Sequence, residues 1–225
     1  MINYHPNQQL LLLHIKGELP LSMSLAISAH AELCDICHKS LSLLTKQQTI
    51  AVFSDKNITT GSTADIDMAL LLEKMIDCTL DELDSTPSAP VDMGTIEVSV
   101  KGQSYTLPSA FRHQINAPWQ GIGKISRLRL NTGEEKARAS LLHIAANGEI
   151  PQHTHKGSEL TLLLAGEFSD KFNSYKPGDF MLLDENHEHS PQTTTGCLCY
   201  TIVDAPLYFT KGFSKLLNPI GELLY

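Results

Sequence analysis

The 225-residue sequence lacks any long hydrophobic run. Its longest strongly apolar stretch, Leu10 to Leu13, is far shorter than the ~20 residues that a membrane-spanning helix needs. The N-terminus also lacks the basic start and apolar stretch that are typical of a signal peptide. We therefore expect a soluble, cytoplasmic protein with no membrane partner.

Positive charge is scarce, above all in the first part of the chain. Residues 1–90 contain five lysines, no arginine and eleven acidic residues, and the whole chain carries a net charge of -8. A basic surface for phosphate contacts is therefore missing, which disfavours direct nucleic-acid binding and a DNA-binding regulator. The acidic first part would suit a basic protein surface instead.

The cysteines do not indicate a disulfide framework. There are five of them, an odd number, and a cytosolic setting keeps thiols reduced. The sequence also contains ten histidines. Together these residues favour metal binding.

The first part of the chain has helical patterning. A short helix is expected around residues 7–15, ending at Gly17, and residues 22 to about 44 contain no Gly or Pro and favour one helix. Another helix is expected after Thr63. These patterns predict a small helical domain over residues 1–84, followed by a Pro- and Ser-containing linker at 85–93.

From residue 94 to 225 the sequence favours short β-strands. Strands are expected near the apolar or alternating segments 95–100, 125–130, 139–145, 160–164, 180–183 and 199–203. Turn signals such as Asn147-Gly148 and Pro177-Gly178 separate several of them. The spacing is typical of a β-sandwich or small β-barrel, so the chain is predicted to be an α + β two-domain protein.

A possible metal site lies in the helical part. On a helix, His30, Cys34 and Cys37 would project from one stripe and form a soft nitrogen and sulfur ligand set suited to tetrahedral Zn²⁺. The candidates for the fourth ligand are histidines: His5 is the best placed, and His14 and His38 are alternatives. A closed set of four protein ligands predicts a structural role.

A second possible metal site lies in the β part. His153 and His155 are two residues apart and would face the same side of a strand, and Glu159 opens the next apolar strand. His189 follows a later turn, with His187 as the alternative in the other register. Three imidazoles and a carboxylate suit Zn, Mn, Fe or Ni and leave room for water or a ligand.

These motifs together carry a family resemblance. The second cluster has the His-x-His-x₃-Glu-x₆-Gly spacing of a cupin, a small β-barrel. The segments that carry the wider resemblance are His5-Pro6, residues 17–20, the His30-x₃-Cys34-x₂-Cys37 spacing, and residues 159–170, 175–179 and 184–191. Over most of its length the chain resembles the ChrR family of zinc-binding anti-sigma factors.

The resemblance implies a function and two zinc sites. The helical domain would hold a group IV (extracytoplasmic-function) sigma factor away from RNA polymerase, and the cupin domain would sense oxidative stress such as singlet oxygen or organic hydroperoxides. Zinc would bind to two sets of residues: His5, His30, Cys34 and Cys37 in the first, and His153, His155, Glu159 and His189 in the second. No catalytic residues are implied.

Two further interpretations of the sequence stay open. A mononuclear metal cupin enzyme, such as a dioxygenase or isomerase with an accessory zinc domain, is the alternative function. Cys197 and Cys199 would face one side of a strand, where packing in the core is favoured over a redox role.

Overall fold

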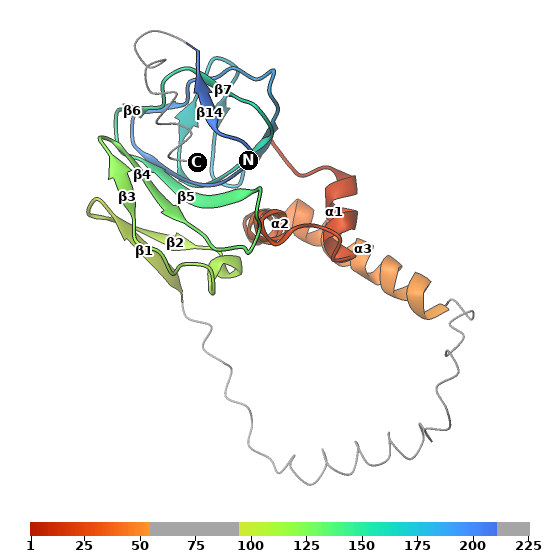
Figure 1. Cartoon of the computed structure of the whole chain (residues 1–225). Coiled ribbons are helices and arrows are strands. Elements are labelled where there is room, and N and C mark those ends of the chain that lie inside the picture. Colours follow the sequence, from red (N-terminus) through yellow and green to blue (C-terminus); the bar gives the residue numbers. More distant parts are fainter. Residues whose placement is uncertain (55–94, 211–225) are drawn as a thin grey trace, which may run out of the picture. The chain divides into compact units, whose positions relative to one another are not determined.

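A computed structural model describes residues 1–54 and 95–210 of the chain, with helices first and β-strands after them (Figure 1). The helices are α1 (Gln8–Ile15), α2 (Leu21–Leu33) and α3 (Asp35–Ser54). The strands and the one short 3₁₀ helix are β1 (Ile96–Val100), β2 (Gln103–Leu107), η1 (Ser109–Phe111), β3 (Gln120–Ile122), β4 (Ile125–Arg129), β5 (Arg138–Ile144), β6 (Gly148–Glu149), β7 (His153–His155), β8 (Glu159–Gly166), β9 (Phe168–Ser169), β10 (Ser174–Tyr175), β11 (Phe180–Leu183), β12 (Gln192–Thr193), β13 (Cys197–Val203) and β14 (Leu207–Phe209).

The chain divides into two compact units. Residues 1–45 group with the chain from residue 95 onward, and residues 46–94 form the second unit. The expected linker at 85–93 and the helix expected after Thr63 lie outside the described residues. The α1 and α2 helices therefore belong to the same compact unit as the β-strands. We call residues 95–210 of this unit the β half.

The helices confirm the expected pattern except at one point. The side chain of Asn7 caps α1 by accepting a hydrogen bond from the Leu10 amide, and Gly17, with a φ of 69°, follows the end of that helix. The single helix expected from residue 22 to about 44 is wrong, because the backbone is extended at Cys34 (φ -127°, ψ 101°). The Cys34 carbonyl accepts from the His38 amide, so this residue starts a new helix, α3. No helix within residues 1–54 or 95–210 combines the length and apolar character that membrane crossing requires.

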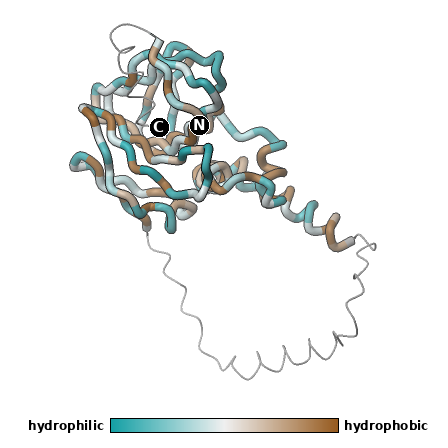
Figure 2. The backbone as a smooth tube through the Cα atoms, in the orientation of Figure 1, coloured by the Kyte–Doolittle hydropathy of each residue, from teal (hydrophilic) through white to brown (hydrophobic). Residues whose placement is uncertain are grey.

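The β half consists of antiparallel sheets. Six strands hydrogen-bond in the order β11-β8-β13-β5-β4-β3, and four short strands in the order β10-β9-β12-β6. The β1 and β2 strands form a hairpin, and β14 pairs with β7. All six strands expected from the sequence are present, and the central ones are buried because they carry continuous apolar runs (Figure 2).

The α2 helix shares one hydrophobic core with the β half. Ala26, Ile27 and Ala29 of α2 are fully buried, in one cluster with Phe111 and Tyr200. Small residues on this helix face permit close approach to the strands. Burial of this face explains why residues 21–33 belong to the same unit as the β-strands.

Side-chain hydrogen bonds hold both ends of α2. The carboxylate of Glu134 accepts from the Ser22 amide (2.7 Å) and hydroxyl (2.7 Å), at the start of the helix. Near the other end, the carboxylate of Glu32 accepts from the amides of Ser109 and Ala110 at the start of η1. Anions are favourable at such positions because helix N-termini present unpaired N–H groups.

The buried hydroxyl of Tyr200 provides a test of this packing. It donates to the Ser22 carbonyl at 2.9 Å, and the side chain is fully buried. Tyr200→Phe should lower the free energy of unfolding by about 1 kcal/mol, because one buried hydrogen bond is lost. Urea unfolding should show a lower midpoint, whereas Tyr208→Phe, at a tyrosine that is 44% exposed, should leave it unchanged. Equal midpoints for the two variants would contradict a stabilising role for this contact.

Candidate metal centres

The eight residues that the sequence predicts as metal ligands lie in two separate clusters in the structure. Within each cluster, one potential ligand atom from every residue lies within 4.8 Å of the others. The clusters consist of His5, His30, Cys34 and Cys37, called the Cys/His cluster, and of His153, His155, Glu159 and His189, called the His/Glu cluster. Of these eight residues, only His5 is exposed.

The helix break at Cys34 shapes the Cys/His cluster. It places Cys34 and Cys37 at the start of α3, while His30 remains in the last turn of α2 and His5 approaches from the N-terminal segment. The Nδ1 atom of His5 lies 3.4 Å from Cys34 Sγ and 3.5 Å from Cys37 Sγ. Two atoms bound tetrahedrally to one zinc ion, one nitrogen and one sulfur, would lie about 3.6 Å apart. The spacing therefore fits a tetrahedral ion.

The protonation state of His30 leaves one ring nitrogen that could bind a metal ion. Its Nδ1 lies 2.7 Å from the Gly178 carbonyl oxygen, which can only accept, so Nδ1 carries the proton. Burial lowers the pKa of His30, which keeps the ring neutral at pH 7. Its buried Nε2 has no hydrogen-bond partner. A neutral imidazole with one nitrogen fixed by a carbonyl and the other free is the usual form of a metal ligand.

The thiols of the Cys/His cluster also fit a bound ion. Burial, together with the neighbouring Cys34, raises the pKa of Cys37 to about 12, so this thiol stays protonated without a cation beside it. A divalent cation would supply the charge that thiolates require. The alternative ligands are not in the cluster: His38 is exposed, and His14 lies on α1.

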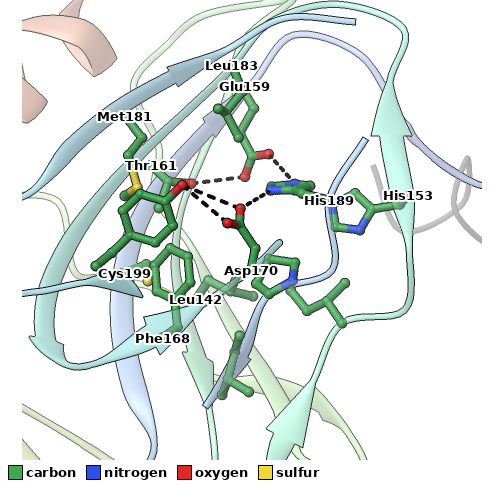
Figure 3. A pocket seen from close by; sticks show the side chains of 14 residues that line it. Leu142, His153, Glu159, Thr161, Phe168, Asp170, Met181, Leu183, His189 and Cys199 are labelled. Atoms are coloured by element: carbon green, nitrogen blue, oxygen red, sulfur yellow. Dashed lines mark hydrogen bonds and ion pairs between the residues drawn. The ribbon is translucent and has the colours of Figure 1, made fainter. Parts of the chain in front are cut away.

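The His/Glu cluster lies inside the β half (Figure 3). His153 and His155 are both buried on β7, as expected for residues two apart on a strand, and Glu159 begins β8. A backbone bridge between residues 153 and 189 brings His189 beside them, with 3.0 Å between the Nε2 atoms of the two rings. His187 lies outside the cluster, where its Nδ1 is 2.7 Å from Asp184 Oδ1 near the surface.

Unpaired atoms point into the His/Glu cluster. Glu159 Oε2 lies 2.5 Å from His155 Nε2 and 3.4 Å from His189 Nε2, within ion-pair distance, but neither Glu159 Oε2 nor His155 Nε2 has a hydrogen-bond partner. Nδ1 of His153 donates to the Pro151 carbonyl at 2.8 Å, so its Nε2 carries a lone pair, which lies 3.0 Å from His189 Nε2. Buried polar atoms without partners are unfavourable, and a cation between them would satisfy several at once.

The electrostatics of the His/Glu cluster match this arrangement. Burial and the neighbouring His189 lower the pKa of His153 to about 4, so that ring is neutral at pH 7. Burial alone would raise the pKa of Glu159, but His155 and His189 outweigh it and hold this pKa well below its usual range. The neutral imidazole of His153 and the ionised carboxylate of Glu159 are forms that bind transition metals.

Several residues that lie around the clusters were given no role in the prediction from the sequence. Asp170 lies beside His189, with Oδ2 3.7 Å from Nδ1, and Tyr175 donates to Asp170 at 3.4 Å (Figure 3). Asp179 is fully buried and accepts from backbone amides of the N-terminal segment. Carboxylates that lie around metal ligands have no fixed spacing from them in the sequence, and Asp170 and Asp179 were marked only as parts of the segments 159–170 and 175–179 that carry the family resemblance.

The other cysteines of the β half lie in its core. Cys197 and Cys199 are buried in a cluster with Leu163, Phe168 and Met181. The neighbouring Cys197 thiol and burial raise the pKa of Cys199, which disfavours the reactive thiolate. Their environment agrees with the packing role favoured from the sequence.

The cavity beside the His/Glu cluster is small. Its volume is about 30 Å³, and it is lined by cluster residues and by apolar side chains that include Leu142, Phe168 and Met181. A buried water needs about 10–15 Å³ of such volume. The cavity therefore has room for a water-sized molecule.

Comparison with known proteins agrees with this architecture. Residues 110–205 match the family model of the ChrR cupin-like domain, which assigns the β half to the cupin fold. The crystal structure of Rhodobacter sphaeroides SigE in complex with the anti-sigma ChrR contains a similar chain, with a TM-score of 0.64 and 26% identity, covering 91% of this chain and all of that one.

A curated relative extends the similarity to the helices. The anti-sigma-E factor ChrR of Cereibacter sphaeroides is 30% identical over 231 residues, which cover 99% of each protein. The similarity therefore spans the N-terminal helices as well as the cupin domain. At this identity over the full length, the chain belongs to the ChrR family of anti-sigma factors.

Proposed function

We propose that this protein is a zinc-dependent anti-sigma factor that holds a group IV sigma factor and releases it under oxidative stress. The observation that carries the proposal is the full-length match to ChrR in a chain that keeps two complete ligand clusters. The stress would be of the singlet-oxygen or organic-hydroperoxide type. The acidic N-terminal part suits a partner whose basic surfaces normally contact DNA and polymerase.

The two clusters suit different roles for zinc. Two thiols and two imidazoles around the helix break form a soft, closed set, where zinc supplies a structural cross-link between α2, α3 and the N-terminal segment. The His/Glu set adjoins a cavity, as a site open to small molecules would. Its donors also suit Fe, Mn or Ni, but we propose zinc in both clusters.

The cavity supports a regulatory rather than an enzymatic role. An organic substrate needs a pocket of roughly 300–1,000 Å³, whereas about 30 Å³ is present beside the His/Glu cluster. A small oxidant such as singlet oxygen would fit in that space. We therefore propose that the chain has no catalytic turnover.

The α3 helix offers a surface for the sigma factor. Ile36 and Leu43 lie seven residues apart on this helix and are 64% and 57% exposed. Side chains at this spacing fall on one stripe of a helix, and an exposed apolar stripe is typical of a surface that a partner covers. We place the primary contact with the sigma factor there.

A signal at the His/Glu cluster needs a physical route to the helices. His189 lies beside Asp170, which accepts from the Tyr175 hydroxyl, and the Tyr175 ring packs on Tyr4 with 5.4 Å between ring centroids. Tyr4 immediately precedes His5 of the Cys/His cluster. Contacts of this kind let a change in one ligand set bias the position of the other.

Co-purification tests the function directly. The zinc-loaded chain should form a stable complex with a group IV sigma factor of its own organism and should inhibit transcription from that factor's promoters. Addition of an organic hydroperoxide or a singlet-oxygen generator should dissociate the complex. Failure to bind any of these sigma factors with both clusters loaded would overturn the proposal, and turnover of a small molecule would favour the enzymatic alternative.

The α3 stripe can be tested with matched leucines. Leu43→Glu should weaken sigma-factor binding at least about tenfold, because loss of one buried leucine contact costs about 1.5–3 kcal/mol. Leu182→Glu is the control, since Leu182 is similarly exposed (52%, against 57% for Leu43) but lies on β11. Isothermal titration or surface plasmon resonance would measure both affinities. Equal affinities would show that the stripe is not the contact surface.

Removal of one thiol tests the Cys/His cluster. Cys37→Ser should reduce the bound zinc from two ions to one per chain and abolish sigma-factor binding, because the closed ligand set is lost. The exposed neighbour His38 provides the control, and His38→Ala should retain both ions. Elemental analysis of the purified variants gives the stoichiometry. Two zinc ions in the Cys37→Ser protein would contradict the assignment.

The His/Glu cluster should control release rather than binding. Glu159→Ala removes a ligand within the β half, so the variant should still bind the sigma factor but should fail to release it when exposed to singlet oxygen. Glu149→Ala, at an exposed residue on β6, should behave as the wild type. Fluorescence anisotropy of a labelled sigma factor would follow release. Loss of binding by Glu159→Ala would contradict the division of roles.

A further inference from the structure

The Cys/His cluster depends on residues that lie far from it in the sequence. We propose that the Pro177–Asp179 turn of the β half is a positioning element for this cluster: Gly178 orients His30, and Asp179 fixes the N-terminal segment that carries His5. This inference rests on the proposed zinc binding and adds the control of that site by the β half.

The first contact acts on His30. The Gly178 carbonyl accepts from His30 Nδ1 at 2.7 Å, within a region where the ring is fully buried. A carbonyl in this position selects the tautomer whose Nε2 can bind a metal and sets the orientation of the ring. The ring also packs edge-on against Phe180, 5.7 Å between centroids, which limits its rotation. The β half thus determines where this ligand points.

The second contact acts on the segment before His5. The buried side chain of Asp179 accepts from the amides of Asn3 (2.7 Å) and Tyr4 (3.1 Å) through Oδ1, and from the Lys176 amide (2.8 Å) through Oδ2. The Tyr4 carbonyl accepts in turn from the Phe180 amide at 3.0 Å. Both backbone groups of Tyr4 are therefore bonded to the β half, which leaves His5 little freedom.

The turn itself is held rigidly. The Gly178 amide donates to the Leu163 carbonyl at 2.8 Å, and the Leu163 amide donates to the Asp179 carbonyl at 3.1 Å, which ties the turn to β8. Gly178 has a φ of 94°, and a Cβ there would lie 2.3 Å from Cδ1 of Ile2. Only glycine combines this backbone conformation with close contact to the N-terminal segment.

Two of the four proposed ligands are therefore supported by one turn outside the helices. Loss of the hydrogen-bond partners that orient metal ligands typically weakens metal binding by about 10–100-fold. The zinc affinity of the Cys/His cluster should accordingly depend on the N-terminal segment keeping its contacts with this turn.

Variants on both sides of the contact test this role in the full-length chain. Asp179→Asn places an NH₂ group against a backbone N–H, and Asn3→Pro removes one donor without changing the β half. Asn3→Ala keeps the N–H and is the matched control for the proline variant. Both test variants should bind Zn²⁺ at the Cys/His cluster about 10–100-fold more weakly than the wild type, by chelator competition. In Asn3→Pro the zinc affinity of the His/Glu cluster should fall less than that of the Cys/His cluster, because all four of its ligands lie in the β half.

Cobalt substitution separates positioning from general destabilisation. Absorption from thiolate-to-Co²⁺ charge transfer reports the Cys/His cluster alone, because the His/Glu cluster contains no cysteine. The cobalt spectrum of the Cys/His cluster should change in Asn3→Pro and stay unchanged in Asn3→Ala. If Asn3→Pro has the affinity and spectrum of Asn3→Ala, the positioning role is wrong. If the wild type shows no thiolate–cobalt absorption, the proposed zinc function fails instead.

Discussion

The buried ring of His30 lies where α2 meets the β half, and much of the structure depends on how its two nitrogens are used. One nitrogen bonds to the Gly178 carbonyl, and the other is left unpaired in the Cys/His cluster. A fully buried imidazole with an unpaired nitrogen is unfavourable unless a further partner is present. The same residue therefore links the packing of α2 on the β half to the zinc binding that we propose for the cluster.

The sequence indicated which residues would lie together in the two clusters. It did not predict the helix break, the shared core and the tertiary contacts that bring them together. Apolar runs located the main strands, because a buried strand must be apolar over its whole length, as in β8 and β13. The helix break at Cys34 was missed, since no Gly or Pro marks it and local propensity favours a continuous helix. The shared core was missed as well, because the small residues Ala26 and Ala29 give no strong hydrophobic signal. Asp170 and Asp179 act through tertiary contacts that sequence spacing does not encode.

The two clusters differ in ways that fit different roles in regulation. The Cys/His cluster joins segments that are separate in the sequence, and removing an ion from it would loosen the start of α3, the helix that the sigma factor contacts under our proposal. The His/Glu cluster is enclosed by strands that hold their positions through sheet hydrogen bonds, so a change of ligands there would leave the barrel intact. The first arrangement suits a site whose loss abolishes binding, and the second suits a site that receives a signal.

Coupling between the clusters follows from their shared contacts. The N-terminal segment bonds to Asp179 and Phe180, and it packs through Tyr4 on Tyr175, which reaches the surroundings of His189. Burial and the nearby Asp170 raise the pKa of Tyr175, so its hydroxyl remains a donor at neutral pH. Because binding free energies are reciprocal, any effect of the His/Glu cluster on the Cys/His cluster must act equally in the other direction. A bound sigma factor that stabilises the Cys/His cluster would therefore also change the affinity of the His/Glu cluster for its ion, and the response to stress would differ between the free protein and the complex.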